Sequence, residues 1–102
     1  MQRVTIWVPV IKTLRDRHLA ALWQTGRSKR IASNLQRATL RKLVLLDNAM
    51  NLNDLAVVPD NHLEGLKGER KGQYSIRVND QFGLCFRWSE GDAYDVEFVD
   101  YH

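Results

Sequence analysis

Three short runs of alternating apolar and polar residues make up the stretch QYSIRVNDQFGLCFRWSEGDAYDVEFVD, residues 73–100. They cover residues 73–78, 82–88 and 93–100. Alternation with a period of two residues is typical of strands that bury one face. Turn-forming residues separate the runs: Asn79 and Asp80 in the first gap, and SEGD, residues 89–92, in the second. Strands joined by such short turns pair antiparallel, so this stretch predicts an antiparallel sheet.

The residues just before this stretch predict one more strand and, further upstream, a strand followed by a helix. Residues 62–66 form the additional strand, joined to the sheet by the charged turn KGERKG, residues 67–72. Residues 10–14, VIKTL, contain β-branched and apolar residues and predict a short strand. Residues 15–24 follow as a helix that Gly26 ends. The apolar face of this helix consists of Leu19, Leu22 and Trp23.

A second and longer helix is predicted over residues 34–50, with Ser33 as its N-cap. Its predicted buried face repeats at helical spacing and consists of Leu35, Thr39, Leu43, Leu46 and Met50. Residues 51–56 predict one more short helical turn, which Pro59 prevents from continuing.

Hairpin-linked strands preceded by two helices predict an α+β fold, mainly an antiparallel sheet with the helices packed on one face. At 102 residues and 11.9 kDa the chain has room for one hydrophobic core, so we expect a single domain over residues 1–102. No apolar run approaches the roughly 20 residues of a membrane helix, and residues 1–9 make a poor secretory signal. We therefore expect a cytoplasmic protein with no membrane partner.

The composition argues against several classes of protein. Cys85 is the only cysteine, so an internal disulfide is excluded, and no Cys or His spacing indicates a metal site. No motif of proteases, kinases or nucleotide-binding enzymes is present, and we expect no cofactor. The net charge of +3 and the isoelectric point of about 9.3 suit a polyanionic partner, although mild basicity is common among proteins that never bind nucleic acid.

Cations on or beside the predicted strands and three polar residues at the C-terminus are the remaining candidates for chemistry. The cations are Lys67, Arg70, Lys71, Arg77 and Arg87, and the C-terminal residues are Asp100, Tyr101 and His102. Taken one by one, they are the expected contents of a solvated sheet face and a frayed tail. Taken together, they match the needs of RNA cleavage by the 2′-hydroxyl, namely a base, an acid and cations that stabilise charge on phosphorus. His62 is a weaker candidate for proton transfer, because a lone His at a strand start is more often structural or exposed.

Two segments resemble a known family. They are LEGLKGERKGQYSIRVNDQFGLCF, residues 63–86, and VEFVDYH, residues 96–102. The chain is similar there to the HigB branch of the RelE-type toxins, and the helical half from Ile11 also fits. The matching motif positions are Leu63, Leu66, Gly68, Arg70, Gly72, Ser75, Ile76, Arg77, Val78, Asn79, Asp80, Gln81, Phe82, Leu84, Phe86, Asp100, Tyr101 and His102.

The resemblance implies a compact RelE-like fold and an mRNA endoribonuclease that acts in the ribosomal A site and so inhibits translation. It also implies a HigA-like helix-turn-helix antitoxin that neutralises the toxin and represses the shared operon on operator DNA. By position, the catalytic residues implied are Asp100, Tyr101, His102 and Lys67. Arg70, Lys71 and Arg77 are assigned to RNA or ribosome contact.

Two positions depart from the family pattern. Glu64 stands where some relatives have a His, whose role is then absent, taken by the carboxylate, or displaced to His62. Gly83 replaces the Arg that usually follows the aromatic residue. Losing a guanidinium directed at the scissile phosphate would cost about 2.7–4 kcal/mol of transition-state stabilisation, by analogy with removing an oxyanion-hole donor. We therefore hypothesise that Gly83 marks an attenuated toxin. Residues 1–9 have no counterpart in the pattern and are interpreted as an N-terminal extension.

Three functions remain open from the sequence. The leading one is a ribosome-dependent RNase. The second is a toxin-fold binding module that acts mainly with its antitoxin in repressing the operon, its catalysis weakened by Gly83. A gyrase poison of the related RelE/ParE kind is less favoured, because the complete Asp-Tyr-His at residues 100–102 speaks for RNA cleavage.

Overall fold

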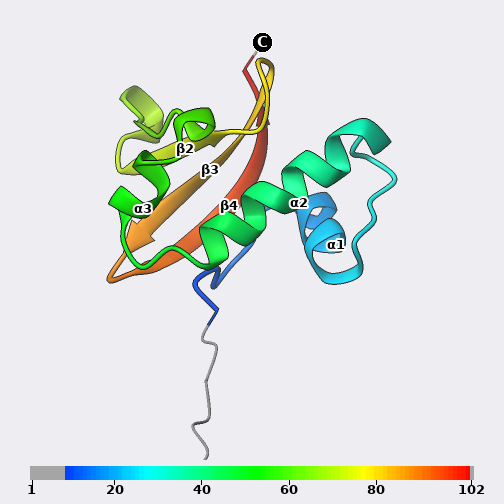
Figure 1. Ribbon diagram of the computed structural model, residues 1–102, viewed down its shortest axis with the longest axis horizontal. Coiled ribbons are helices and arrows are strands. Elements are labelled where there is room, and N and C mark those ends of the chain that lie inside the picture. Colours follow the sequence, from blue (N-terminus) through cyan, green and yellow to red (C-terminus); the bar gives the residue numbers. More distant parts are fainter. Residues whose placement is uncertain (1–8, 102) are drawn as a thin grey trace, which may run out of the picture.

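Four antiparallel strands form one sheet in the computed structural model, which describes residues 9–101. The strands are β1 (Glu64–Gly65), β2 (Gln73–Arg77), β3 (Phe82–Ser89) and β4 (Asp92–Asp100). They lie side by side in chain order, β1-β2-β3-β4, and β3 and β4 form a long curved hairpin (Figure 1). The predicted antiparallel meander is confirmed.

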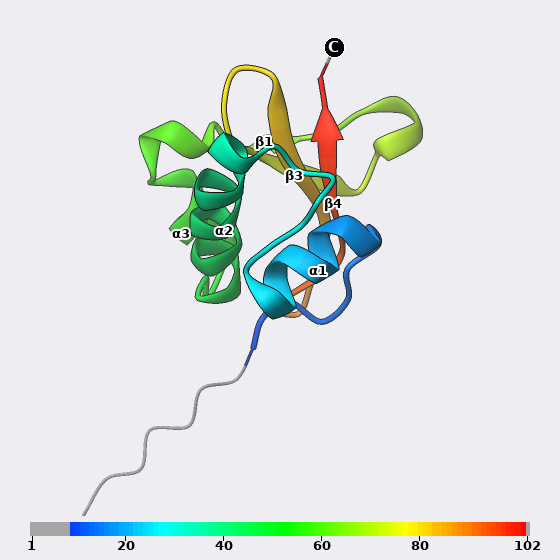
Figure 2. The ribbon, with the colours of Figure 1, turned by 90° about the vertical axis from the view of Figure 1, so that its right-hand side faces the viewer.

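The helices precede the sheet in the chain and pack against one of its faces. They are α1 (Arg17–Thr25), α2 (Ser33–Asp47) and the short α3 (Leu52–Ala56), followed by the 3₁₀ turns η1 (Pro59–Asn61) and η2 (Gly68–Arg70). Figure 2 shows the helices and the sheet as separate layers. Asp16 caps α1 by accepting hydrogen bonds from the backbone N–H groups of His18 and Leu19, and Gly26 ends the helix in the left-handed conformation.

One hydrophobic core lies between the two layers. Alternate residues of the strands point toward the helices, and Ile76, Leu84 and Phe86 are fully buried there. The helices contribute four leucines with no exposed surface: Leu19, Leu22, Leu43 and Leu46. The α+β prediction is therefore confirmed, with the period of two in the strands and the helical spacing meeting in the same core.

Several predicted elements have different bounds in the structure. In place of a strand over residues 10–14, only isolated parallel bridges occur, Ile11 with Ala93 and Leu14 with Val96. Helix α2 ends at Asp47, three residues before the predicted end, and its N-cap is Ala32. These two corrections are linked, because the buried Asp47 carboxylate accepts hydrogen bonds from the N–H groups of Val10 and Ile11, each at 2.9 Å.

The predicted burial of Met50 is wrong. This side chain is 83% exposed, since the chain leaves the helix at Asn48 and begins α3 four residues later, at Leu52. The strand predicted over residues 62–66 is also shorter than expected. His62 adopts a left-handed conformation (φ 45°), which is incompatible with a strand, so pairing is limited to Glu64 and Gly65.

Residues 1–8 of the predicted extension lie outside the described residues. Within residues 9–101, no helix combines the length and apolar character needed to cross a bilayer.

Candidate active site

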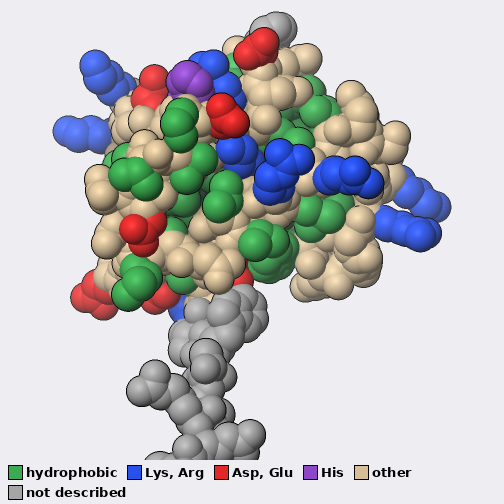
Figure 3. Space-filling model, in the orientation of Figure 1, with side chains coloured by type: hydrophobic (Ala, Val, Ile, Leu, Met, Phe, Trp, Pro, Cys, Tyr) green, Lys and Arg blue, Asp and Glu red, His purple; other side chains and the backbone are tan. Residues whose placement is uncertain are grey.

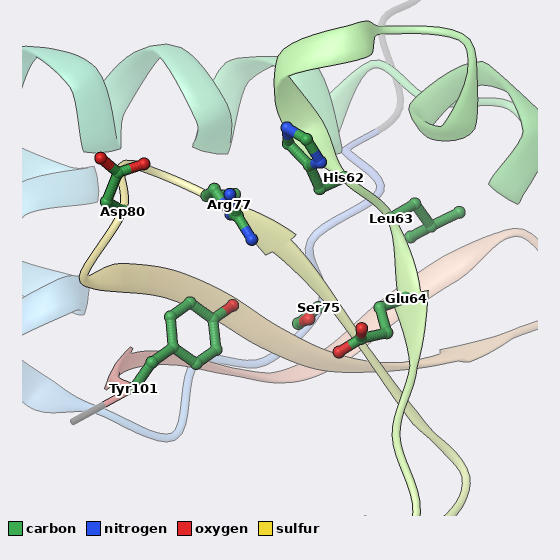
Figure 4. A pocket seen from close by; sticks show the side chains of 7 residues that line it. All are labelled: His62, Leu63, Glu64, Ser75, Arg77, Asp80 and Tyr101. Atoms are coloured by element: carbon green, nitrogen blue, oxygen red, sulfur yellow. The ribbon is translucent and has the colours of Figure 1, made fainter.

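A hollow of about 400 Å³ opens where β1 and β2 meet the C-terminal end of β4. Its lining is mostly polar and comes from segments far apart in the sequence: His62, Leu63, Glu64, Ser75, Arg77, Asp80 and Tyr101 (Figure 4). It therefore brings together a histidine, two carboxylates, two hydroxyls and a guanidinium.

The strand register explains why these polar side chains share one place. Ser75 and Arg77 alternate with the core residue Ile76, so both lie on the sheet face that is turned away from the helices. Glu64 is directly opposite Ser75 across β1 and β2, and Gly83 is opposite Arg77 across β2 and β3. Cross-strand partners project to the same side of a sheet, so the pairing of β1 with β2 and of β2 with β3 brings these residues together at the floor of the hollow.

Tyr101 reaches the hollow from the far edge strand. Its backbone N–H donates a hydrogen bond of 2.8 Å to the carbonyl of Gln81, which holds the chain against the turn between β2 and β3. From there the ring crosses β3 at Gly83, and its hydroxyl points toward Ser75 and Arg77 (Figure 4). The end of β4 thereby supplies a phenol to a site that is otherwise made by β1 and β2.

The phenol of Tyr101 is kept in its neutral form. Partial burial raises the pKa of Tyr101, and the charges of Cys85 and Glu64 act in the same direction. A hydrogen bond from Ser75 and the charge of Arg77 lower this pKa, but burial is the largest cause and the net shift is upward. A neutral phenol can donate a proton or a hydrogen bond to an anion in the hollow.

His62 is placed by a buried polar anchor next to it. Asn61 has no exposed surface; its side-chain amide donates to the carbonyl of Leu55 at 3.0 Å, and its oxygen accepts from the Lys42 ammonium at 2.6 Å. Burial is the main cause that lowers the pKa of Lys42. Because Asn61 is tied to both α2 and α3, the left-handed residue that follows it projects an exposed imidazole beside Arg77 (Figure 4).

A second hollow of about 240 Å³ continues the first one toward α2. His62, Arg77 and Asp80 border both, while Arg41 and Lys42 line only the second. The imidazole and the guanidinium thus stand between two polar depressions, which is an arrangement suited to a ligand longer than one phosphate group.

Comparison with known proteins places this fold in a family. The family model described as "RelE-like toxin of type II toxin-antitoxin system HigB" matches residues 12–102. The chain belongs to this HigB-like toxin family. Membership in a type II toxin-antitoxin family implies an antitoxin partner.

Curated relatives of similar length support this assignment. Toxin HigB-1 of Vibrio cholerae is 38% identical over 89 residues, which cover 86% of this chain and 93% of the relative. A protein named Endoribonuclease HigB, of Proteus vulgaris, is 31% identical over 94 residues, covering 91% of this chain and all of the relative. An uncharacterized protein of Haemophilus influenzae is 37% identical, with coverage of 86% and 87%.

Of the site residues predicted by resemblance to the HigB family, the structure brings Tyr101 and Arg77 into the main hollow. Lys67 is exposed in a neighbouring depression, lined also by Glu64, Gly65 and Leu66. Glu64 belongs to both depressions, so Lys67 lies next to the site and not within it.

The other predicted residues lie elsewhere. The Arg70 guanidinium pairs with the Glu97 carboxylate at 3.4 Å, a contact that raises the pKa of Arg70. Lys71 is exposed in the turn before β2 and does not line the hollow. Asp100, paired with Phe82, accepts a hydrogen bond of 3.3 Å from the Gln81 side chain. His102 lies outside the described residues.

Ser75 and Asp80 line the hollow, although the sequence indicated no role for them. Both belong to the family motif, and the period of two in β2 would have placed Ser75 on the same face as Arg77. Asp80 is presented by the turn in which the Asn79 side chain accepts hydrogen bonds from the N–H groups of Gln81 and Phe82, at 2.8 and 2.7 Å. In the described part of the chain, no group of three or more His, Cys, Asp or Glu side chains could hold a metal ion.

Proposed function

We propose that this chain is an endoribonuclease toxin that cleaves mRNA on the ribosome and is neutralised by a HigA-like helix-turn-helix antitoxin. One observation carries the proposal: a neutral phenol, an imidazole and a guanidinium face one polar hollow, contributed by Tyr101, His62 and Arg77. The name of the Proteus vulgaris relative, Endoribonuclease HigB, supports the same activity.

The reaction required is attack of the 2′-hydroxyl oxygen on the neighbouring phosphorus, which breaks the bond from phosphorus to the 5′-oxygen. A base must accept the 2′-hydroxyl proton, and the imidazole of His62 or the carboxylate of Glu64, two residues apart on the segment that leads into β1, can do so. The protonated phenol of Tyr101 can give its proton to the leaving oxygen. Arg77 then stabilises the additional negative charge on the phosphate, as cations do in phosphoryl transfer.

Dependence on the ribosome fits the openness of this site. The hollow is partly open to solvent and mostly polar, so by itself it offers few apolar surfaces on which nucleotide bases could stack. We propose that the A site supplies the missing positioning by presenting the mRNA backbone to Arg77, with Lys67, Arg70 and Lys71 on the same side of the domain for RNA contact. The toxin would then work in the cytoplasm and inhibit translation, and operator DNA would be reached through the antitoxin.

The proposal is tested by mRNA cleavage on programmed ribosomes with antitoxin-free protein. We expect cleavage by the unmodified chain, a loss of about 100-fold or more for Tyr101→Phe, and a similar loss for Arg77→Ala. A variant lacking His102 tests the remaining residue of the C-terminal motif. The matched control is Arg87→Ala, since Arg87 is an exposed arginine of the same sheet that pairs with Asp95 and lies outside the hollow.

Absence of cleavage by the unmodified chain would contradict the proposal. In that case the binding-module function gains support, because Gly83 stands where the family pattern has Arg. Growth arrest on expression separates the two functions, since only an active RNase is expected to cause it. Equal losses for Arg77→Ala and Arg87→Ala would instead show that general basicity, and not the hollow, carries the activity.

A further inference from the structure

The contact between Tyr101 and Gly83 leaves no space for any side chain at residue 83. A Cβ atom built on Gly83 would overlap the phenol oxygen and lie only 2.8 Å from Cε2 of the same ring. Gly83 is buried near the start of β3, where the ring of the exposed residue Tyr101 covers it. The ring therefore lies directly on the β3 backbone.

The backbone of Gly83 does not itself require glycine. Its φ angle lies outside the left-handed region, unlike those of Gly26, Gly68, Gly72 and Gly91. It pairs regularly on both sides, with Arg77 of β2 and Val99 of β4. Glycine inside a strand weakens it, and a common reason for its presence is the close approach of another group. Here that group is the ring of Tyr101.

We propose that Gly83 is a positioning residue: the missing side chain provides the seat on which Tyr101 rests, so that its hydroxyl reaches Ser75 and Arg77 in the hollow. The role of this seat in cleavage rests on the proposed function, whereas its geometry does not. A side chain at residue 83 and the seated phenol exclude each other. An Arg at this position, as in the family pattern, would therefore displace Tyr101 from this seat and would not simply add a cation to the site.

The seat is tested first by the ionisation of Tyr101. In Gly83→Ala the ring must leave the β3 backbone and become more exposed, so we expect the phenol to titrate at lower pH than in the unmodified chain. The signal of Tyr101 is the difference between the near-ultraviolet titration of each protein and that of the same protein carrying Tyr101→Phe. The matched control is Gly65→Ala in β1, where a new Cβ would meet only the Tyr74 ring at an ordinary distance of 3.7 Å.

A second variant keeps the test decisive if Gly83→Ala folds poorly. With Tyr101→Ala the seat is empty, and adding Gly83→Ala should then raise the melting temperature, because alanine suits a strand interior better than glycine. In the unmodified background the same change should raise it less or lower it. Equal effects in the two backgrounds, or an unchanged titration of Tyr101 in Gly83→Ala, would overturn the proposal.

Cleavage on ribosomes measures what the seat does for the reaction. We expect Gly83→Ala and Gly83→Arg to lose about 100-fold, as for loss of a general acid or base, and Gly83→Ala to cause no further loss in the Tyr101→Phe background. Faster cleavage by Gly83→Arg would overturn the proposal and support an attenuated toxin. A titration shift without cleavage by any protein would support the seat and contradict the proposed function.

Discussion

At the scale of single residues, protonation in the folded state follows burial. Tyr101 is 44% exposed, yet the covered part of its ring is enough to raise the pKa of the phenol. Cys85 lies on the same face of the sheet as Ser75 and has almost no exposed surface. Burial raises the pKa of its thiol. Both groups are therefore neutral at physiological pH, so neither adds a charge beside Glu64 and Arg77 on this face of the sheet.

The first prediction concerns the stability of the fold in alkali. Because the pKa of Tyr101 is higher in the folded than in the unfolded chain, the neutral phenol favours folding. This contribution is complete below the ordinary tyrosine pKa of about 10 and is lost as the pH rises through the folded-state pKa. Chemical unfolding at several pH values should show a smaller alkaline loss of stability for Tyr101→Phe than for the unmodified chain. A larger loss for the variant would contradict the assignment.

The second prediction concerns Cys85. A buried thiol with a raised pKa has little thiolate at neutral pH, and the thiolate is the reactive form. We expect iodoacetamide to leave Cys85 unmodified in the folded chain while labelling it rapidly in denaturant, as measured by intact-protein mass. Labelling at the rate of a free thiol without denaturant would show that this face of the sheet opens readily.

At the scale of elements, short polar anchors and not regular secondary structure position the site. The chain from η1 to β1 makes only two residue pairs with β2, so Asn61 supplies much of its attachment through Lys42 and Leu55. The Asp47 carboxylate similarly fixes Val10 and Ile11 beside β4 at the C-terminal end of α2. Helix α2 therefore anchors two segments whose own pairing is minimal.

The third prediction tests this anchor. Asn61→Ala would leave the Lys42 ammonium and the Leu55 carbonyl without their buried partner, which should lower the free energy of unfolding by about 1–3 kcal/mol. Asn53→Ala, an exposed asparagine of α3, serves as control and should change it by less than about 0.5 kcal/mol. Urea unfolding measures both. Equal effects of the two substitutions would show that the buried amide is not an anchor.

At the scale of the whole molecule, the positive charge is spread over more than one face. Figure 3 shows Lys and Arg side chains spread over the face that carries α2, with acidic side chains between them on one side. The exposed residues Arg27, Lys29 and Arg30 lead into α2, and Arg41 continues along it beside the second hollow. The face that carries α2 and the helix-free face with the site thus both present cations.

The fourth prediction concerns salt. If these cations neutralise rRNA phosphates, ribosome binding should weaken as the salt concentration rises. The logarithm of the binding constant should then fall linearly with the logarithm of the salt concentration. Replacing Arg41 by Ala should reduce the slope by about 1 if this side chain contacts one phosphate. Binding can be measured by cosedimentation with ribosomes over a salt series. A slope of zero, meaning that binding does not depend on salt concentration, would contradict phosphate contact by this face.

Much of the fold could be predicted from local patterns. The alternation in residues 73–100 determined three of the strands and their antiparallel pairing, because period and turn chemistry act over only a few residues. Helical spacing did the same for α1 and for most of α2. Helical spacing failed at Met50, because the periodic pattern extends beyond the residue at which the helix ends. The helix ends at Asp47, whose carboxylate binds the backbone of Val10 and Ile11, and these residues are distant in sequence.

The sequence alone also determined the family and the C-terminal motif, since both are patterns of residue identity. The tertiary structure decided how the site is composed. It placed His62 beside Arg77, paired Arg70 with Glu97 outside the hollow, and seated Tyr101 on Gly83. None of these contacts is encoded by spacing along the chain, because each depends on strand register and side-chain direction across segments that meet only when the core has formed.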